Sequence, residues 1–522
     1  MAAIKGAVAA GHAATADAAE AVLREGGNAF DAALAAIAAA TVAEPVLSSL
    51  GGGGFLMAQP ANGKPVLYDF FTQTPKQRRR EDEVDFFPIV ADFGATQQEF
   101  HIGMASVATP GMVRGLFDVH TDLGRMPMTE VLAPAVALAK QGLQLNRLQA
   151  YIFSVVGPIY ESNPTILAQF ESSTRPGELC GEGDFYRCPD QADALDALAH
   201  EGAELFYRGE MGASLIEACR DRGGHLTRAD LQDYRLERRA PLTRLWRDAR
   251  LLTNPPPSSG GLLIAFALEL LRDETCARDG FGGWTHLDRL TRAMALTNKA
   301  RVDHGLHEAG EDGAVARLLD PGLVESYRQQ VLGRPAASRG TTHVSVMDGE
   351  GNAAAVTVSN GEGSGYVLPG TGIVINNMLG EEDINPHGFH QWPTDMRQAS
   401  MMAPSLLLKA NGGQVALGSG GSNRIRTAIL QVLLNIGHFG MALEEAVPAP
   451  RLHFERGRLN AEPGFEPNLL NRLSADPLVE DLCQWDDLNL FFGGVHAVSQ
   501  DRSGVLHGAG DPRRGGVIRV LD

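Results

Sequence analysis

The spacing of hydrophobic residues changes once along the chain, near residue 340. Before that point, apolar residues recur with the period of a helix. Asn28 precedes an alanine-rich stretch that Pro45 ends, so residues 29–43 are predicted to form a helix that is buried on most sides. Further helices are predicted over residues 14–24, 128–140 and 191–200.

After residue 340 the apolar residues alternate with period two, which is typical of strands. Two such runs, 344–346 and 356–358, flank the turn-rich residues 348–352 and predict a β-hairpin. Strands are also predicted over 372–377, 405–409 and 414–417, and an apolar helix over 423–436. Runs of helices followed by runs of strands indicate the α+β class.

The same change of pattern divides the chain. Residues 308–339 look the least structured, and they end in the small and polar residues 336–340. We therefore expect a large segment, residues 1–340, and a small segment, residues 341–522.

Composition narrows the class of protein. A net charge of −18 over 522 residues repels phosphate backbones, so nucleic acid is not an expected partner. Because the first residues lack a basic segment followed by an apolar run, and no apolar window is long enough to span a bilayer, we expect a soluble, cytoplasmic protein. The five cysteines are scattered; a Cys180–Cys188 disulfide is possible by spacing, but free core thiols are favoured.

The predicted hairpin brings two hydroxyl side chains together. If it is symmetric about Glu350, Thr341 lies opposite Ser359, with Cβ atoms about 4.5–5.5 Å apart. Both residue types are also common on strand faces, so the pairing alone does not show a catalytic role. A hydroxyl nucleophile needs a base, and no GxSxG motif is present. One solution is a threonine whose own α-amine is the base, which requires cleavage of the Gly340–Thr341 bond and no cofactor.

Glycine-rich and histidine-containing segments offer further candidates. Residues 418–423 join a strand to a helix, where backbone N–H groups can stabilise an oxyanion, bind a phosphate or simply cap the helix. For residues 51–54 we favour a structural close approach of backbones over an anion site. The pairs His304/His307 and His387/His390 have a spacing that metal ligands can use but lack a third ligand, so no metal is expected.

Seven short motifs occur in an order that resembles the gamma-glutamyltranspeptidase family across nearly the whole chain. They lie at residues 26–33, 51–55, 109–111, 255–261, 341–343, 372–377 and 418–421. The resemblance implies an αββα sandwich of the N-terminal-nucleophile hydrolase type, made as one inactive chain that cuts itself before a threonine. The two segments would then stay paired as one intertwined catalytic unit. Whether such units assemble into larger oligomers is left open.

The resemblance also implies the catalytic residues. Thr341 would be the nucleophile that accepts a γ-glutamyl group from glutathione-like amides and passes it to water or an amino acid. Ser359 stands where the family has a second threonine. Gly421 and Ser422 match the oxyanion-hole glycines, with a serine in place of the second; because the donors are main-chain groups, that exchange is tolerated.

The substrate-binding residues depart from the family pattern. Phe71 stands where the family has an arginine for the substrate α-carboxylate, and Ser400-Met401 replaces a pair of serines. The family residues associated with the α-amine correspond to Met378 and Glu381, and Asn360 and Asn377 complete the predicted substrate-binding set. Replacing a guanidinium is not conservative, so the acyl pocket is expected to be more apolar. Arg397 or Arg424 could replace the missing clamp.

Three hypotheses follow. The first is a gamma-glutamyltranspeptidase-like enzyme that favours hydrolysis of a small-molecule amide. The second keeps the threonine but uses another acyl group, as the related cephalosporin (glutaryl) acylases do. The third is a homologue that is never processed and acts as a binding protein.

Overall fold

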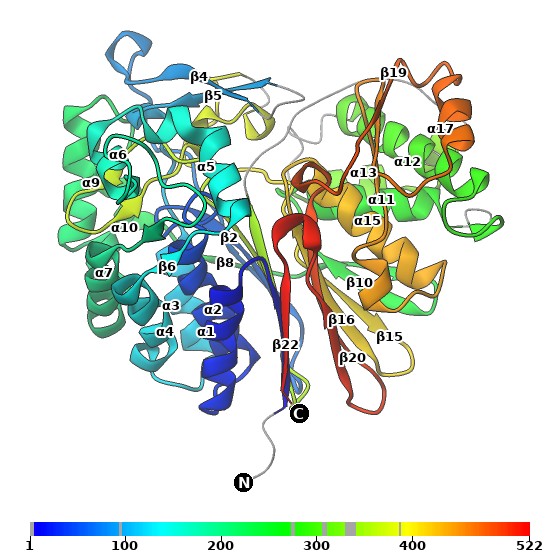
Figure 1. The fold of residues 1–522 in the computed structure, drawn as a ribbon, viewed down its shortest axis with the longest axis horizontal. Coiled ribbons are helices and arrows are strands. Elements are labelled where there is room, and N and C mark those ends of the chain that lie inside the picture. Colours follow the sequence, from blue (N-terminus) through cyan, green and yellow to red (C-terminus); the bar gives the residue numbers. More distant parts are fainter. Residues whose placement is uncertain are drawn as a thin grey trace.

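Two β-sheets face each other at the centre of the molecule, and helices cover the outer face of each (Figure 1). The computed structural model describes residues 5–92, 97–272, 277–304, 311–328, 341–385 and 388–521. This four-layer arrangement is the predicted αββα sandwich of the N-terminal-nucleophile hydrolase type, and it confirms the α+β class.

The first sheet has seven strands, each antiparallel to its neighbours. In spatial order they are β22 (Val517–Leu521), β1 (Gly6–Ala10), β11 (Thr342–Asp348), β12 (Ala353–Ser359), β2 (Gly53–Gln59), β3 (Val66–Phe70) and β8 (Glu237–Arg239). The first and last strands of the chain therefore lie side by side, next to the strand that begins at Thr342 (Figure 1).

The second sheet has six strands, also antiparallel. Its spatial order is β21 (Leu506–Ala509), β20 (Gly494–Gln500), β16 (Gln414–Gly420), β15 (Ser405–Lys409), β10 (Ala249–Thr253) and β9 (Leu242–Trp246). Each sheet takes strands from both sides of residue 340, so the two predicted segments are interleaved in one fold.

Helices pack on the two outer faces. Those beside the first sheet include α1 (Ala13–Arg24), α2 (Ala29–Ala43), α3 (Met112–Leu123), α4 (Met128–Gln141) and α7 (Pro189–Glu201); those beside the second include α11 (Gly260–Leu270), α12 (Trp284–Asp303) and α15 (Arg424–Gly437). Helix α2 begins as predicted, because the Asn28 side chain accepts from Phe30 N and Asp31 N while Asp31 accepts from Asn28 N. All of its residues are buried.

Smaller elements surround these layers. They are β4 (Phe87–Asp92), β5 (Gln97–Ile102), β6 (Leu143–Gln144), α5 (Arg147–Tyr160), α6 (Pro164–Phe170), β7 (Phe185–Tyr186), α8 (Glu204–Tyr207), α9 (Glu210–Asp221), α10 (Arg228–Asp233), α13 (Glu311–Leu318), α14 (Pro321–Arg328), β13 (Val367–Leu368), β14 (Ile373–Val374), α16 (Leu443–Ala446), β17 (Leu452–Glu455), β18 (Arg458–Ala461), α17 (Pro467–Ser474) and β19 (Asp481–Gln484). Short 3₁₀ turns include η4 (Met378–Gly380), η5 (Glu382–Ile384), η6 (Leu490–Phe492) and η7 (Pro512–Arg514).

The β11–β12 hairpin has the predicted register. Thr342 pairs with Val358 and Val344 with Val356, so the hairpin is symmetric about Glu350. Asp348 closes the turn, because its Oδ1 accepts from the backbone N–H of the turn. One further step in this register places Thr341 opposite Ser359.

Two expectations need correction, and one strand was not expected. Helices α13 and α14 occupy much of the stretch that looks unstructured in the sequence, whereas 305–310 and 329–340, including the segment boundary, lie outside the described residues. The sequence pattern does not predict strand β1, because its small residues are buried throughout and show no alternation. Of residues 372–377, only β14 forms a strand.

Two further findings concern cysteines and membranes. Cys180, Cys188 and Cys219 are buried free thiols, as favoured; Cys483 is free but only half-buried, and Cys276 lies outside the described residues. No helix in the described ranges has both the length and the apolar character that crossing a bilayer requires.

Candidate active site

A cavity opens between the two sheets, where β11 begins and β12 ends. It encloses about 370 Å³ of empty space, part of it open to solvent. Its lining consists of Phe71, Thr341, Ser359, Met378, Glu381, Ile384, Ser400, Met401, Met402, Ser422 and Ile425. Most of the predicted site residues are therefore brought together here, although they come from segments far apart in the sequence.

Thr341 lies directly before β11 and its side chain is buried. The carbonyl oxygen of Thr341 packs on Gly420, where an added Cβ would lie only 2.0 Å from it. The same oxygen accepts a hydrogen bond of 3.0 Å from Nη1 of Arg514. Next along the chain, the hydroxyl of Thr342 donates to Glu44 Oε2 at 2.8 Å. The chain at the candidate nucleophile is therefore held by β16 of the second sheet, by η7 and by the end of α2.

Ser359 ends β12 and lines the same cavity as Thr341. Its Oγ accepts a hydrogen bond from Gly361 N at 3.1 Å. The hydroxyl hydrogen of Ser359 therefore points away from Gly361 N. Gly52 packs on the carbonyl of Ser359, where a Cβ would lie 2.3 Å from the oxygen. The glycines at 51–54 thus permit close backbone contact, as we favoured from the sequence.

The glycine-rich turn joins β16 to α15 beside Thr341. Gly421 and Ser422 have φ values of +113° and +53°, and Ser422 lines the cavity. Their main-chain N–H groups lie at the N-terminal end of α15, where the helix dipole favours negative charge. The arrangement suits an oxyanion, although Gly421 itself is not part of the lining.

The part of the cavity lined by Phe71, Met378 and Met401 is largely apolar. Phe71 is fully buried and stacks on Phe55, with ring centroids 5.4 Å apart. Ser400 is held in place because its Oγ accepts from Met402 N at 3.0 Å and its carbonyl accepts from Ser258 Oγ at 2.8 Å. In the described part of the lining there is no arginine, lysine or histidine, and Glu381 is the ionisable side chain.

Neither suggested replacement arginine lines this cavity. Arg397 lies behind Phe71, and its guanidinium donates to the carbonyls of Phe71 and Arg235 and to the hydroxyl of Tyr234. It also forms an ion pair with Asp69 at 3.5 Å. Arg424 stacks over Phe491, with 4.1 Å between the guanidinium carbon and the ring centroid. Arg397 is therefore structural, and the lining formed by the described residues contains no cationic clamp.

His343, two residues after Thr341 in the sequence, is not placed to act as its base. His343 lies in β11, where Nδ1 contacts Thr357 Oγ1 at 2.7 Å and Nε2 contacts Ser345 Oγ at 2.9 Å. Burial lowers the pKa of His343 well below its ordinary value, so the ring is neutral. Its contacts with two structural hydroxyls leave the α-amine of Thr341 as the candidate base.

Asn360 and Asn377 lie outside the cavity lining, so their assignment to substrate binding stays a prediction. Asn377 Oδ1 accepts from Glu362 N at 3.0 Å, and Asn360 is fully buried next to Ser359. Asn377 thereby supports the turn that follows β12.

The histidine segments with metal-like spacing are only partly described by the structure. In the ranges that the structure describes, no three His, Cys, Asp or Glu side chains meet closely enough to hold a metal ion. His307, Glu308 and His387 lie outside those ranges. His304 Nε2 contacts the hydroxyl of Tyr327 at 3.0 Å.

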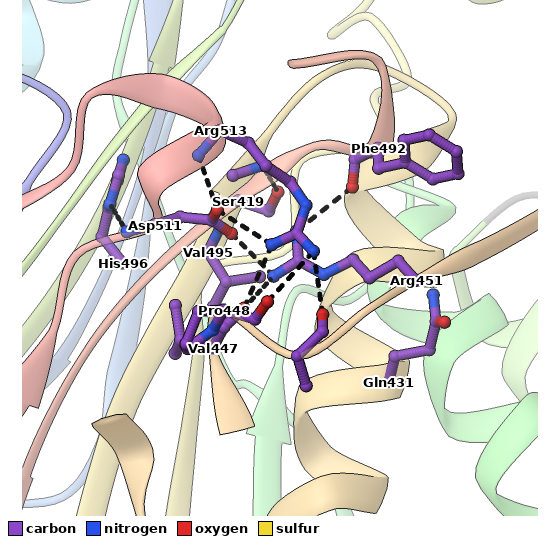
Figure 2. A network of polar contacts seen from close by, with 12 residues as sticks. Ser419, Gln431, Val447, Pro448, Arg451, Phe492, Val495, His496, Asp511 and Arg513 are labelled. Atoms are coloured by element: carbon purple, nitrogen blue, oxygen red, sulfur yellow. Dashed lines mark hydrogen bonds and ion pairs between the residues drawn. The ribbon is translucent and has the colours of Figure 1, made fainter. Parts of the chain in front are cut away.

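A buried ionic network holds the turn η7 next to the site (Figure 2). Sequence patterns do not predict this network. Arg451 donates to Asp511 Oδ2 at 2.6 Å, and Asp511 also accepts from Arg513 Nη1 at 3.1 Å. Arg513 in turn donates to Glu462 Oε1 at 2.7 Å. These side chains hold η7, whose last residue is Arg514. They come from separate parts of the chain, so no local sequence pattern indicates the network.

Comparison with known proteins gives consistent matches along the chain. Residues 15–521 match the family described as Gamma-glutamyltranspeptidase. The chain is 29% identical to the glutathione hydrolase proenzyme of Escherichia coli (strain K12), over 94% of this chain and 87% of that one. It is also 29% identical to the acylase ACY 1 proenzyme of Pseudomonas sp. (strain V22), over 94% and 88%. The crystal structure of cephalosporin acylase from Bacillus halodurans superposes with a TM-score of 0.84 at 25% identity, covering 99% of this chain and 96% of that one.

Proposed function

This chain belongs to the gamma-glutamyltranspeptidase family, and we propose that within it the protein is a self-processing N-terminal-threonine amidase that hydrolyses acyl amides. One observation carries the proposal: Thr341 directly precedes β11, Ser359 ends its partner strand β12, and both line one cavity with Ser422 of the glycine-rich turn. A nucleophile, a supporting hydroxyl and a candidate oxyanion site therefore converge on a space that holds a small acyl group.

Processing would create the catalytic base. The Oγ of Thr341 attacks the carbonyl carbon of Gly340, and the amide becomes an ester through an N-to-O shift. Water then hydrolyses that ester, which leaves a carboxylate on Gly340 and a free α-amine on Thr341. The glutathione hydrolase and acylase relatives are both proenzymes, which supports such a step.

Catalysis would reuse the same oxygen. The α-amine takes the proton from Oγ of Thr341, directly or through one water, as Oγ attacks the substrate carbonyl. The N–H groups of residues 421–422 stabilise the oxyanion, and the leaving amine departs with the proton. Water then attacks the threonyl ester, the amine again acting as base, and releases the acid.

The lining favours an uncharged, apolar acyl group. A γ-glutamyl group would bring an α-carboxylate into a cavity whose described lining has no cation and is dominated by Phe71, Met378 and Met401. An unpaired buried carboxylate is strongly disfavoured. We therefore rank acylase activity above glutathione hydrolysis. The second candidate, γ-glutamyl transfer or hydrolysis, is supported by Glu381, whose carboxylate suits an α-ammonium group.

A substrate series tests this ranking. We would compare the p-nitroanilides of hexanoic acid, glutaric acid and γ-linked glutamate with the processed protein. The expected order of kcat/KM puts hexanoyl first, ahead of glutaryl and γ-glutamyl, because the last two each bring a carboxylate that no cation of the described lining receives. Fastest release from the γ-glutamyl anilide would reverse the ranking.

Two variants test the nucleophile. Thr341→Ala should stay full-length and inactive, whereas Thr243→Ala, which alters an exposed hydroxyl on β9, should be cleaved and active. A wild-type chain that stays uncut and inactive would support the non-catalytic alternative. Activity in Thr341→Ala would refute the proposed mechanism.

A further inference from the structure

Arg514 links the candidate nucleophile to the candidate oxyanion turn. It ends η7, and only 7% of its surface is exposed. Its Nη1 donates to the carbonyl of Thr341 at 3.0 Å, and a Cβ added to Gly421 would lie 3.1 Å from its Nη2. One guanidinium therefore contacts both halves of the site without lining the acyl cavity.

The ionic network makes the position of Arg514 rigid (Figure 2). Asp511 caps η7 by accepting from Arg513 N at 3.0 Å, and its other oxygen accepts from Val495 N at 2.8 Å and from Arg451. Asp511 and Arg451 are almost completely buried. Because Asp511 and Arg451 are buried and each makes several hydrogen bonds, they hold η7 in one position. The side chain of Arg514, the last residue of η7, is therefore preorganised.

The charge of Arg514 lies close to the nitrogen that must act as base. The amide nitrogen and carbonyl oxygen of one residue are at most about 3.7 Å apart. Nη1 of Arg514 therefore lies within about 7 Å of the α-nitrogen of Thr341. Burial lowers the pKa of Arg514 to about 10, so the guanidinium is still charged at neutral pH. A neighbouring positive charge disfavours protonation of an amine.

Other charged groups face the same residue from the surrounding elements. Glu44, at the end of α2, bonds Thr342, and Glu381 reaches the cavity from the η4–η5 segment; both would raise the pKa of an ammonium group. Arg424 of α15 lies near Arg514 and has the opposite effect. Burial lowers the pKa of His496, on β20, to about 4, so it is neutral. Arg514 donates a hydrogen bond to the carbonyl of Thr341 itself. Its positive charge lowers the pKa of the α-amine, whereas the carboxylates of Glu44 and Glu381 raise it.

We propose that Arg514 is a positioning residue that also keeps the α-amine of processed Thr341 unprotonated near neutral pH. The inference rests on the proposed function. An ordinary α-amine has a pKa of about 7.7–8.0. One charge about 6 Å away, at an effective dielectric between that of a protein surface and water, lowers it by about 0.5–2 pH units. Without this effect, much of the enzyme would carry a protonated, inactive base at pH 7.

The acid limb of the kcat/KM pH profile tests the proposal, because a purely structural role would lower activity equally at every pH. Arg514→Gln should move this limb up by about 0.5–2 pH units, and activity at low pH should fall about tenfold for each pH unit that the limb moves. Arg514→Lys, which keeps the charge, should restore most of the limb. If the acid limb lies at the same pH in the wild type and in Arg514→Gln, the proposal is overturned.

A second variant covers the case in which Arg514→Gln is not processed. Glu44→Gln keeps an oxygen acceptor for Thr342 but removes a negative charge, so the acid limb should move to lower pH. If the acid limb of Glu44→Gln stays at the wild-type pH, nearby charges do not change the pKa of the Thr341 α-amine, which contradicts the proposal. Normal cleavage and activity in these variants, with inactive Thr341→Ala, would leave the proposed function standing even then.

Discussion

Arg451→Met should destabilise the protein far more than the loss of one surface ion pair. Arg451 is 1% exposed and donates to Asp511 Oδ2, to the carbonyl of Val447 at 2.9 Å and to the carbonyl of Phe492 at 3.2 Å (Figure 2). Methionine fills a similar volume but donates nothing. The substitution therefore leaves a buried carboxylate with one cationic partner fewer and two carbonyls with one donor fewer.

The magnitude follows from burial. Removing one partner of a buried ion pair costs about 3–5 kcal/mol, because the remaining charge loses part of its compensation. Arg458→Met is the matched control: Arg458 pairs with Asp481 at 3.0 Å, but the side chains are 46% and 58% exposed. An exposed pair of this kind contributes about 0–1 kcal/mol. The two substitutions should thus differ by several kcal/mol.

Urea titrations followed by tryptophan fluorescence measure the difference. Acid sensitivity is a second readout. Burial alone would raise the pKa of Asp511, but Arg451 and Arg513 hold it below its ordinary value. The stability that Asp511 contributes is therefore present above about pH 4 and lost as pH falls through its lowered pKa. Arg451→Met should move that loss to higher pH. A loss of stability no larger than in the Arg458 control would refute the reasoning.

Three further predictions concern other buried positions. Burial lowers the pKa of His286 to about 4, so below pH 6.5 the unfolded chain binds a proton that the folded protein does not; stability should fall toward pH 4 by about 1.4 kcal/mol per pH unit for this residue, and His286→Asn should show a shallower slope in urea unfolding. Gly420→Ala should abolish cleavage on denaturing gels, because its Cβ would meet the carbonyl of Thr341 at 2.0 Å, whereas Gly313→Ala, which has open space around it, should be cleaved normally. Ser422→Gly should raise the unfolding free energy by about 1 kcal/mol by relieving its positive φ, with activity retained through the main-chain N–H; Ser422→Ala should show no such gain.

The fold is predictable where local chemistry decides it. Asn28 and Asp31 form a capping box, so the start of α2 can be identified without its neighbours. The turn closed by Asp348 fixes the hairpin register, and that register by itself places Thr341 opposite Ser359. In both cases the determining contacts lie within a few residues.

The rest depends on contacts between distant segments. Strand β1 is small and wholly buried, so it has no polar face to reveal its period. Arg514 contacts a residue 173 positions away, and nothing around it in the sequence indicates that partner. The resemblance to the family indicates the apolar lining only at Phe71, Met378 and Met401; Ile384, Met402 and Ile425 reach the cavity through tertiary packing.

The central claim is that Thr341 becomes the N-terminus of a second chain and thereby gains its own base. Mass spectrometry of the purified protein, with N-terminal sequencing of each fragment, tests this directly. The account predicts two chains, one ending at Gly340 and one beginning at Thr341, in a preparation whose amidase activity grows with the cleaved fraction. Full activity in an uncut chain, or cleavage at another bond that leaves Thr341 internal, would contradict it.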